Sequence, residues 1–485
     1  MTSAAPPYPA RPFAVLATVL PATFMLVVDS SIVNVAIPSI ERQLGASYAE
    51  VQLVVAVYQL AYACVLITAA RLGDIHGRKR LFLTGTAGFT LASIACGAAP
   101  TPGVLIAART VQGLMAGMMT PQVLSVIQVT FPPDQRGRAF GWYGTTIGLA
   151  STTGPLLGGL LIAASPFGLE WRSVFYVNVP IGVAAIAAAA RVLPESRAPS
   201  ARGLDLSGAA LITAALFLVM VPLTEGRQQG FPAWMVAMLV AGLAALAAFG
   251  WLEARKSAAD RSPLVHTGLF RDRGFRRGLA LACLLMFGIP AFFFVVAQYL
   301  QNGFAFTPLH AGLTTFPYAL GTSLTSLASD RLVKRFGPSV VQVGYLVLLG
   351  AVLAMRLVVL ALGSEMSSWD LVGLMFACGL GFGLVYAPLT SMVLERVAPR
   401  DVGAASGVLS TGQMVAAALG VGVIGGLFAA RLPPDALAAP PGHPAREVGF
   451  AAAVSDALLL KVAVVAGCLV LFFALRRARA NRPAA

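Results

Sequence analysis

Residues 13–38 read FAVLATVLPATFMLVVDSSIVNVAIP. The stretch is almost entirely apolar, and it exceeds the roughly 20 residues that a helix needs to cross a bilayer. One acidic residue, Asp29, interrupts it. An ionised carboxylate in the hydrocarbon core costs roughly 2.5 to 3.5 kcal/mol. Because a membrane helix rarely carries such a cost without a use for the charge, Asp29 is the first candidate functional residue.

The whole chain has the composition of a protein with many membrane spans. Hydrophobic residues make up 58% of the 485 residues and charged residues 11%, whereas soluble domains average about 45–50% and 25%. The formal net charge is +14, but the basic residues fall in short loops between apolar segments, where they set topology. We therefore expect the lipid bilayer as a partner and no nucleic acid. The five cysteines stand singly in apolar segments, which predicts neither disulfides nor a metal site.

Apolar windows of about 20 residues predict roughly fourteen spans. They lie near residues 13–37, 49–70, 81–99, 103–126, 138–163, 173–192, 206–223, 233–252, 278–300, 309–329, 338–361, 370–392, 404–429 and 455–475. The segment 431–456 is rich in Pro and Ala and is expected to form an external loop. Lys461 is then expected near the start of the last span, with its ammonium group reaching the membrane interface.

Lys and Arg residues are unevenly distributed over alternate loops. One face of the membrane receives the basic loops, and the other keeps only Arg42, Arg172, Arg227, Arg431 and Arg446. The positive-inside rule makes the basic face, with both chain ends, cytoplasmic. The bias toward Ala, Arg, Gly and Pro, with only four lysines, indicates a bacterium with GC-rich DNA. We therefore expect the bacterial inner membrane, with both termini cytoplasmic.

An internal repeat divides the chain. Residues 70–77, ARLGDIHG, have a partial copy in residues 330–337, DRLVKRFG. Pro133, Gly137, Ala139 and Gly141 recur at the same spacing as Pro399, Gly403, Ala405 and Gly407. Two parallel halves with an even number of inserted spans explain this interval. The predicted domains are 1–200, a six-helix bundle; 201–260, two inserted transmembrane helices; and 261–485, a second six-helix bundle.

Several motifs together resemble those of the major facilitator superfamily. Residues 70–80, ARLGDIHGRKR, resemble its loop signature between spans two and three, although Ala70 and Ile75 depart from the usual Gly and Arg. Residues 109–113, RTVQG, resemble the span-four motif of proton-coupled members, and residues 148–159, GLASTTGPLLGG, resemble the antiporter motif of span five. Segments within 29–38, 171–180 and 298–312 are similar to the fourteen-span drug:proton antiporter-2 branch.

The resemblance implies an all-α membrane protein with the major facilitator fold, in which two six-helix bundles are joined by two inserted transmembrane helices. It implies a monomeric antiporter that uses protons to export hydrophobic or cationic small molecules, such as drugs, antibiotics or secondary metabolites, without a cofactor. A proton symporter or a uniporter of the same fold, importing a small solute, remains an alternative.

Asp29 and Arg109 are the candidate proton-coupling residues. At 1.5 Å per residue, Asp29 lies roughly 12 Å and Arg109 roughly 9 Å from the outer ends of their spans. Similar depths predict that the two side chains meet, with Arg109 modulating the protonation of Asp29 and with Ser30 and Asn34 as polar neighbours. A permanent ion pair that only neutralises two buried charges is the alternative.

The candidate gating residues are Asp74, Gly77, Arg78, Asp134, Gly154 and Pro155. Gly77 permits a tight turn, and Asp74 is expected near helix ends, whose free N–H groups favour an anion. Asp134 is a possible ion-pair partner of Arg78. Gly154 would let two helices approach closely, and Pro155 would kink its helix. A basic loop with turn glycines, which only sets topology, is the simpler alternative for the loop residues.

Asn34, Phe293, Gln298 and Tyr299 are the candidate substrate-binding residues. A set of aromatic side chains with a few polar groups suits a flat lipophilic ligand. The same aromatic residues would serve equally well in packing or against lipid, so both interpretations stay open.

No motif favours an enzyme. The chain contains no HExxH, no clustered His or Cys and no Gly-Lys phosphate loop, which argues against metal-dependent catalysis and against ATP-driven pumping. No soluble signalling domain is recognisable that would favour a sensor. We therefore expect a protein that is not an enzyme and that needs no metal.

Overall fold

The fold is almost entirely helical. The computed structural model describes residues 11–198, 205–226, 230, 232–258, 263–265, 267–395, 397–398, 401–440 and 443–480. Its long helices are α1 (Pro12–Leu44), α2 (Tyr48–His76), α3 (Arg78–Gly97), α4 (Pro102–Thr130), α5 (Pro133–Ala164), α7 (Asn178–Val192), α8 (Leu206–Glu225), α9 (Ala233–Ala258), α10 (Arg273–Gln298), α11 (Pro308–Phe336), α12 (Ser339–Leu362), α13 (Ser368–Leu394), α14 (Val402–Ala430) and α16 (Pro444–Ala480). Short helices are α6 (Ser173–Tyr176) and α15 (Pro434–Ala438).

Local sequence signals set the turn between α1 and α2. Pro12 stands at the start of α1, where a missing N–H breaks no hydrogen bond. Gly45 ends the helix in the left-handed conformation, with φ of 60°. Ser47 then caps α2, because its hydroxyl accepts a hydrogen bond from the Glu50 N–H while the Glu50 carboxylate accepts one from the Ser47 N–H.

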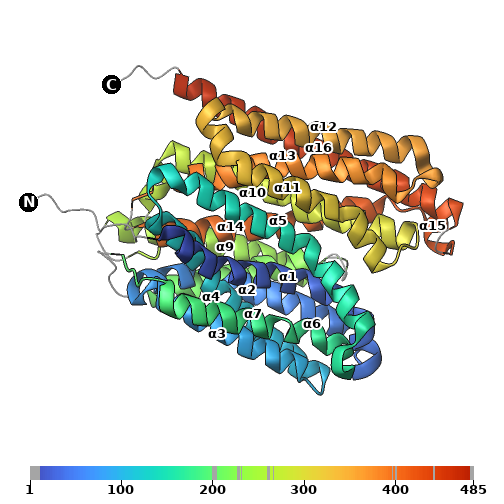
Figure 1. Cartoon of the computed structure of the whole chain (residues 1–485), viewed down its shortest axis with the longest axis horizontal. Helices are drawn as coiled ribbons and strands as arrows, with labels where there is room; N and C mark the ends of the chain where they lie inside the picture. Colours follow the sequence, from blue (N-terminus) through green and yellow to red (C-terminus); the bar gives the residue numbers. More distant parts are fainter. Residues whose placement is uncertain are drawn as a thin grey trace, which may run out of the picture.

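The helices pack in two groups. In the N-terminal group α1 packs against α5 and α7, α2 against α4, and α3 against α4 and α7. In the C-terminal group α10 packs against α14 and α16, α11 against α13, and α12 against α13 and α16. Figure 1 shows the first group below and the second above. The predicted fold of two helical bundles is confirmed, and the domain boundaries at residues 200 and 260 stay a prediction.

Helices of the N-terminal group meet helices of the C-terminal group along a seam. Here α5 contacts α11 and α13, while α2 and α4 contact α14. The inserted helices α8 and α9 pack against each other, and α8 also contacts α2 and α14. The inserted pair therefore lies at the edge of the seam and touches both bundles.

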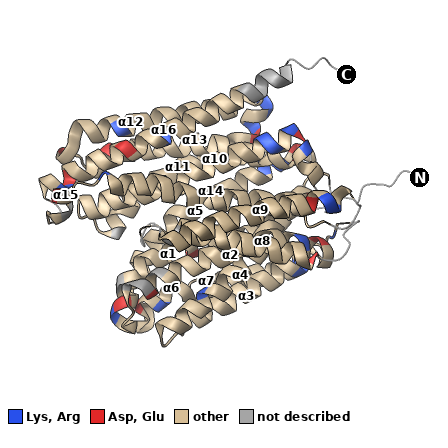
Figure 2. Cartoon of the chain, turned by 180° about the vertical axis from the view of Figure 1, so that it is seen from behind, with Lys and Arg blue, Asp and Glu red and all other residues tan. Residues whose placement is uncertain are grey.

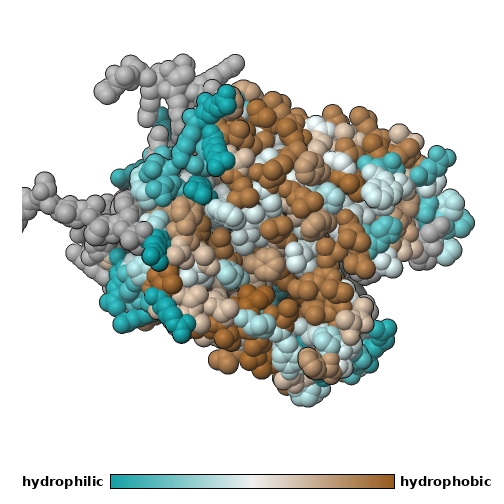
Figure 3. Space-filling model, viewed as in Figure 1, coloured by the Kyte–Doolittle hydropathy of each residue, from teal (hydrophilic) through white to brown (hydrophobic). Residues whose placement is uncertain are grey.

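Within the part of the chain that the structure describes, eleven helical segments are long and apolar enough to span a membrane. The predicted spans 81–99, 103–126 and 309–329 coincide with α3, α4 and α11, which are helical but are not among these segments. The number of fourteen spans thus stays a prediction. An apolar band lies between two hydrophilic ends (Figure 3), and Lys and Arg gather mainly at the end where α1 begins and α16 ends (Figure 2).

Two expectations about the end of the chain are wrong. The segment 431–456 is not a loop throughout, because α15 occupies part of it and α16 begins at Pro444. Ala and other strong helix formers follow that proline, which explains the early start. Lys461 therefore lies well inside α16, and its side chain is 1% exposed instead of reaching the interface.

An ion pair joins the two inserted helices. Asp205, which caps α8, accepts hydrogen bonds from the Gly208 N–H at 3.0 Å and from the ammonium group of Lys256 on α9. Burial alone would raise the pKa of Asp205, but these two donors outweigh burial and lower the pKa to about 2. Because the unfolded value is about 3.9, the ionised form stabilises the folded protein above about pH 4, and this stabilisation is lost as pH falls through about 2.

We expect Lys256→Met to lower the melting temperature of the detergent-purified protein at pH 7. The loss should be at most about 2 kcal/mol, the free energy of the whole pKa shift of Asp205, because the Gly208 N–H and the Ser207 hydroxyl also lower this pKa and remain in the variant. The loss should shrink at pH 3. Lys334→Met is the matched control, because Lys334 is 56% exposed and its pair with Asp330 lies on the surface, where ion pairs add little. Equal melting shifts in the two variants would contradict the prediction.

Candidate functional site

Asp29 lies in a closed polar network inside the N-terminal bundle. Its side chain is 0% exposed and that of Arg109 is 1% exposed. Asp29 Oδ2 accepts a hydrogen bond from Arg109 Nη1 at 2.6 Å. Asp29 Oδ1 accepts one from Gln112 Nε2 at 3.0 Å and one from Asn178 Nδ2 at 2.8 Å. The predicted meeting of Asp29 and Arg109 is therefore present, and α1, α4 and α7 all contribute to it.

Ser93 on α3 completes the network. Its hydroxyl accepts hydrogen bonds from Gln112 Nε2 at 3.2 Å and Asn178 Nδ2 at 2.9 Å, and it donates to the Phe175 carbonyl at 2.9 Å. The sequence did not identify Ser93, Gln112 or Asn178 as partners of Asp29. One signal was available, because Gln112 follows Arg109 by three residues and so shares its face of α4.

Arg109 is held on its other sides as well. Its Nη1 donates to Gln112 Oε1 at 2.7 Å, and its Nε donates to the Val54 carbonyl at 3.2 Å. The guanidinium carbon lies 4.1 Å from the centre of the Tyr58 ring, a cation–π contact. Tyr58 in turn stacks on Tyr62, with ring centres 6.4 Å apart. The buried charge of Arg109 is thus matched by an anion, an amide, a carbonyl and an aromatic face.

Two predicted neighbours of Asp29 lie elsewhere. Ser30 donates its hydroxyl to the Val27 carbonyl at 2.8 Å, and Asn34 is exposed. Asp29 instead accepts hydrogen bonds from donors on α4 and α7, within the N-terminal bundle. The role of Asn34 in substrate binding stays a prediction.

Small residues on α5 let it approach α1 closely. A Cβ on Gly154 would overlap the Ser31 hydroxyl and lie 3.1 Å from the Val28 carbonyl oxygen. A Cβ on Gly158 would lie 2.8 Å from the Ile32 side chain. These glycines face the turn of α1 that carries Asp29, and Pro155 lies between them inside α5. The close approach predicted for Gly154 is present.

We expect Gly154→Leu to destabilise the protein by about 1 to 3 kcal/mol, because the new side chain has no space against α1. Gly159→Leu is the matched control on the same helix, because no atom lies within 4 Å of a Cβ at Gly159. Melting temperatures in detergent measure both variants. A control variant that melts as early as Gly154→Leu would show that any bulky residue in this glycine run is damaging.

Asp74 bridges the two bundles at the end where α1 begins. Its Oδ1 pairs with Arg78 Nη2 at 2.7 Å, and both side chains are buried. A Cβ on Gly403, at the start of α14, would overlap the Asp74 carboxylate. The carboxylate therefore lies against the N-terminus of α14, where free N–H groups and the helix dipole favour an anion, as predicted for Asp74.

The predicted pairing of Asp134 with Arg78 is wrong. Asp134 lies in the first turn of α5 with an exposed side chain, while Arg78 pairs with Asp74 four residues before it. An i, i+4 partner needs no help from tertiary packing to come within reach. Asp134 keeps its gating role only as a prediction.

The turn after Asp74 has the predicted geometry. Gly77 has φ of 112°, which a residue with a side chain rarely adopts, and a Cβ there would meet the Glu195 carboxylate. The Arg78 N–H donates to the Ser196 carbonyl at 3.0 Å, and the Ala198 N–H donates to the Asp74 carbonyl at 3.1 Å. The segment after α7 is thus tied to the loop between α2 and α3.

The seam is closed at the end where α1 begins. Gln128 on α4 donates to the Leu394 carbonyl on α13, and Ser125 bonds Ser406 on α14 at 3.4 Å. Gly141 on α5 lies against the Ser326 carbonyl on α11. At the opposite end the outline of the molecule is notched between the two groups (Figure 3). The structure is therefore sealed at one end and indented at the other.

Phe293 belongs to a row of aromatic rings that crosses the seam. Its ring centre lies 4.8 Å from that of Tyr318, which lies 5.8 Å from Phe382. Phe382 stacks on Tyr386 at 5.2 Å, and Tyr386 stacks on Tyr143 at 6.4 Å. The row starts on α10 and ends on α5, so both bundles contribute to it.

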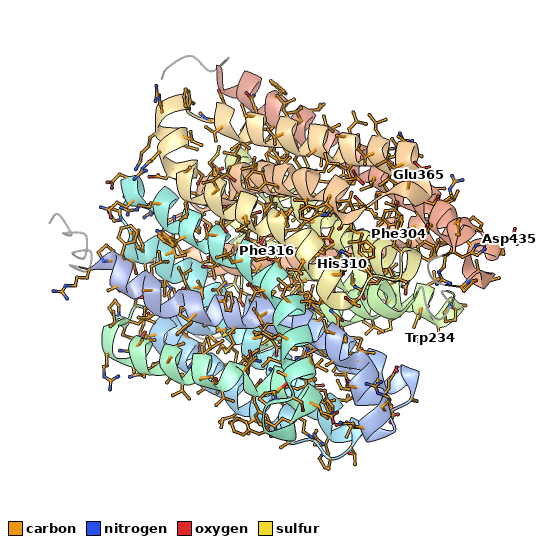
Figure 4. The ribbon with its side chains drawn as sticks, turned by 45° about the vertical axis from the view of Figure 1, so that its right-hand side comes forward. Trp234, Phe304, His310, Phe316, Glu365 and Asp435 are labelled. Atoms are coloured by element: carbon orange, nitrogen blue, oxygen red, sulfur yellow. The ribbon has the colours of Figure 1, made fainter. Side chains whose placement is uncertain are left out.

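Gln298 and Tyr299 are engaged in local contacts. Gln298 accepts a hydrogen bond from Asn302, while Tyr299 is buried, bonds Met366 Sδ at 3.6 Å and packs against Phe304. Figure 4 shows Phe304 toward the end of the molecule opposite the start of α1. In this conformation Tyr299 serves in packing, and its binding role stays a prediction.

Among the residues that the structure describes, no group of three or more His, Cys, Asp or Glu is placed to hold a metal ion.

Comparisons with known proteins agree on the family. The Major Facilitator Superfamily model matches residues 19–421. A probable actinorhodin transporter of Streptomyces coelicolor is 38% identical over 428 residues, which cover 88% of this chain and 74% of that protein. The multidrug resistance protein Stp of Mycobacterium tuberculosis is 35% identical over 413 residues (84% and 74%). The puromycin resistance protein pur8 of Streptomyces alboniger is 34% identical over 412 residues (84% and 80%).

Solved structures share the fold at low sequence identity. The human organic anion transporter MFSD10 has a TM-score of 0.63 and 15% identity, and the match covers 94% of this chain and 100% of that one. The proton:xylose symporter XylE has a TM-score of 0.60 and 13% identity, covering 93% and 95%. The two helical bundles and the sequence match over most of the chain lead to one conclusion. This chain belongs to the Major Facilitator Superfamily.

Proposed function

We propose that this protein exports small hydrophobic or cationic molecules of the antibiotic and drug type in exchange for protons. The observation that carries the proposal is the buried Asp29–Arg109 pair, in a chain whose relatives include a probable actinorhodin transporter and a puromycin resistance protein. A transporter that works against a concentration gradient needs a group that gains and loses charge, and a carboxyl held in the bundle interior supplies one.

The proton step acts on the ion pair between Asp29 and Arg109. Arg109 holds the ionised carboxylate, so a proton on Asp29 removes the anion that ties α1 to α4. Proton binding and the intact ion pair therefore favour different arrangements of these helices. A substrate that prefers the other arrangement then shifts the population between them, which couples the two flows in opposite directions.

Tyr58 and Tyr62 connect this network to the seam. Tyr58 lies under Arg109 and stacks on Tyr62, and Tyr62 bonds Thr120 at 3.3 Å. Tyr62 also lies near Tyr143 and Tyr386, the last two rings of the aromatic row. A flat substrate stacked on that row would lie at one end of a chain of contacts that reaches Asp29 at the other.

The proposal extends to orientation. With both termini in the cytoplasm of a bacterial cell, the sealed end of the seam faces inward, and the notched end faces outward. The conformation is then outward-facing, with Asp74, Arg78, Gly77, Gly154 and Pro155 serving the change to the inward-facing state. The protein acts as a monomer in this scheme, because the bundles of one chain form the seam.

Ethidium, a flat lipophilic cation, is the probe that tests the exchange. Purified protein is placed in vesicles whose lumen is one pH unit more acidic than the outside, with valinomycin and equal potassium holding the membrane potential at zero. Exchange predicts that ethidium accumulates inside at least tenfold, since one proton per cycle and one pH unit give a factor of ten. Nigericin, which dissipates the pH gradient, must abolish the accumulation.

The direction of movement separates the alternatives. A symporter would expel ethidium from the same vesicles, and a uniporter would only equalise its concentration. Either result would refute the proposed exchange.

A further inference from the structure

Lys461 is a buried lysine that pairs with no anion among the described residues. Its side chain is 1% exposed in the interior of the C-terminal bundle, and among the described residues its Nζ has no hydrogen-bond partner. The ammonium nitrogen lies 3.4 Å from the centre of the Phe292 ring on α10. The other three lysines all have oxygen partners: the Ala190 carbonyl for Lys79, Asp205 for Lys256 and Asp330 for Lys334.

The position of Lys461 repeats that of the Asp29 network in the other bundle. α16 packs against α10 and α12, as α7 packs against α1 and α3. In the N-terminal bundle Asn178 on α7 reaches Asp29 on α1, and in the C-terminal bundle Lys461 on α16 reaches Phe292 on α10. Each bundle thus places one titratable side chain at the contact between corresponding helices.

Other roles fit these contacts less well. A side chain needed only to fill space would be Leu or Met, which bury no charge. A structural ion pair requires an anion, and none of the ion pairs in the described part of the chain includes Lys461. A substrate cannot enter the closed bundle interior, but a proton can be passed to a neutral amine by one water molecule.

The neighbouring part of α10 provides a means of opening. A Cβ on Gly288 would lie 4.0 Å from the Lys461 side chain, so the lysine stem runs along this turn. Pro290 lies inside α10 between Gly288 and Phe292, and it removes the hydrogen bond that would close on the Met286 carbonyl. Helices bend at such positions. Bending of α10 would move Phe292 away from the amine and admit water.

Few other titratable groups surround Lys461. Cys378 on α13 lies near it. None of the titratable groups on or next to the elements packed against α16 forms a described ion pair with Lys461. These groups are Arg273, Arg276, Arg277, Cys283, Tyr299, Tyr345, Arg356, Glu365, Arg431 and Asp435. No carboxylate on these elements is therefore placed to hold the charge of Lys461.

We propose that Lys461 is a second proton-binding residue, so that one transport cycle exchanges two protons, one at Asp29 and one at Lys461. The ammonium form releases its proton to water when α10 opens toward the cytoplasm, and the neutral amine takes a proton from water on the outer side. This inference rests on the proposed function, because the second proton has a role only in a proton-driven exchanger.

The ethidium gradient at equilibrium measures the number of protons. In the vesicles described above, two protons per ethidium give a concentration ratio of about 100 at one pH unit, and one proton gives about 10. We expect about 100 for the wild type and about 10 for Lys461→Met, a tenfold loss. Lys334→Met is the matched control and should keep the wild-type ratio, because Lys334 is exposed and paired with Asp330. Counterflow of labelled ethidium without a pH gradient shows which variants are folded and active.

The outcomes separate the two proposals. A wild-type ratio of about 100 that Lys461→Met keeps would overturn the role of Lys461 and leave the exchange intact, and so would a wild-type ratio of about 10. A wild type that builds no gradient would overturn both. If Lys461→Met loses counterflow, Lys461→Gln and Lys461→Arg take its place, because neither side chain exchanges a proton. A ratio of about 100 in either of them would overturn the role of Lys461.

Discussion

Vesicles that carry the double variant Asp29→Asn, Arg109→Gln will hold an ethidium gradient about tenfold smaller than the wild type at one pH unit. Neither new side chain can gain or lose a proton, while both amides can still hydrogen-bond within the network around Ser93 and Asn178. Counterflow of ethidium without a pH gradient should continue, because the helices can still exchange their arrangements. The ratio of inner to outer ethidium at equilibrium is the measurement.

Removing both charges is essential to the design of this experiment. Asp29→Asn alone would leave Arg109 charged and buried without an anion, which costs about 3 to 5 kcal/mol and could unfold the bundle. The double variant avoids that cost and separates coupling from structure. Were Asp29–Arg109 a permanent structural pair, the neutral variant would hold the full gradient, and the proton site would have to lie elsewhere.

The sequence predicts best those features that depend on interactions between residues close together in the chain. Spans, turns and caps depend on residues close together in the chain, so the helix ends at Gly45 and Gly77 were predictable from local rules. The meeting of Asp29 and Arg109 was predictable from their depths alone, because only one vertical coordinate had to match. Depth alone does not determine which side of each helix faces its neighbours. It could not place Gln112 and Asn178 beside Asp29.

The errors have the same origin. Asp134 was matched to Arg78 because their loops were expected to lie close together, but Asp74, which is only four residues away across the turn at Gly77, is the partner. Lys461 was assigned to the interface because the start of α16 was placed too late. In both predictions the position of a residue along the sequence was used to infer its neighbours in space. A difference of a few residues then changed the partner or environment inferred for a charged side chain.

Asp74→Asn is expected to reduce the rate of ethidium exchange per folded protein about tenfold. Because the buried Arg78 loses its anion, the amount of folded protein in the membrane is expected to fall as well. The substitution removes the anion that lies between Arg78 and the N-terminus of α14. A helix-terminal charge interaction contributes about 0.3 to 2 kcal/mol, and about 1.4 kcal/mol shifts an equilibrium between two conformations tenfold. Exchange slows because the sealed state at this end of the seam loses its contact between bundles. Initial rates of counterflow measure the effect.

Two controls determine whether the loss lies in the conformational change. Asp435→Asn removes an exposed carboxylate on α15, at the opposite end of the molecule (Figure 4), and should exchange ethidium at the wild-type rate. Spin labels at Arg80 on α3 and Lys334 on α11, both exposed and in different bundles, report the separation of the sealed end in a variant without native cysteines. A longer label distance in Asp74→Asn is required. If exchange falls but the distance distribution matches the wild type, Asp74 does not hold the two bundles together, and the contact with α14 has another purpose.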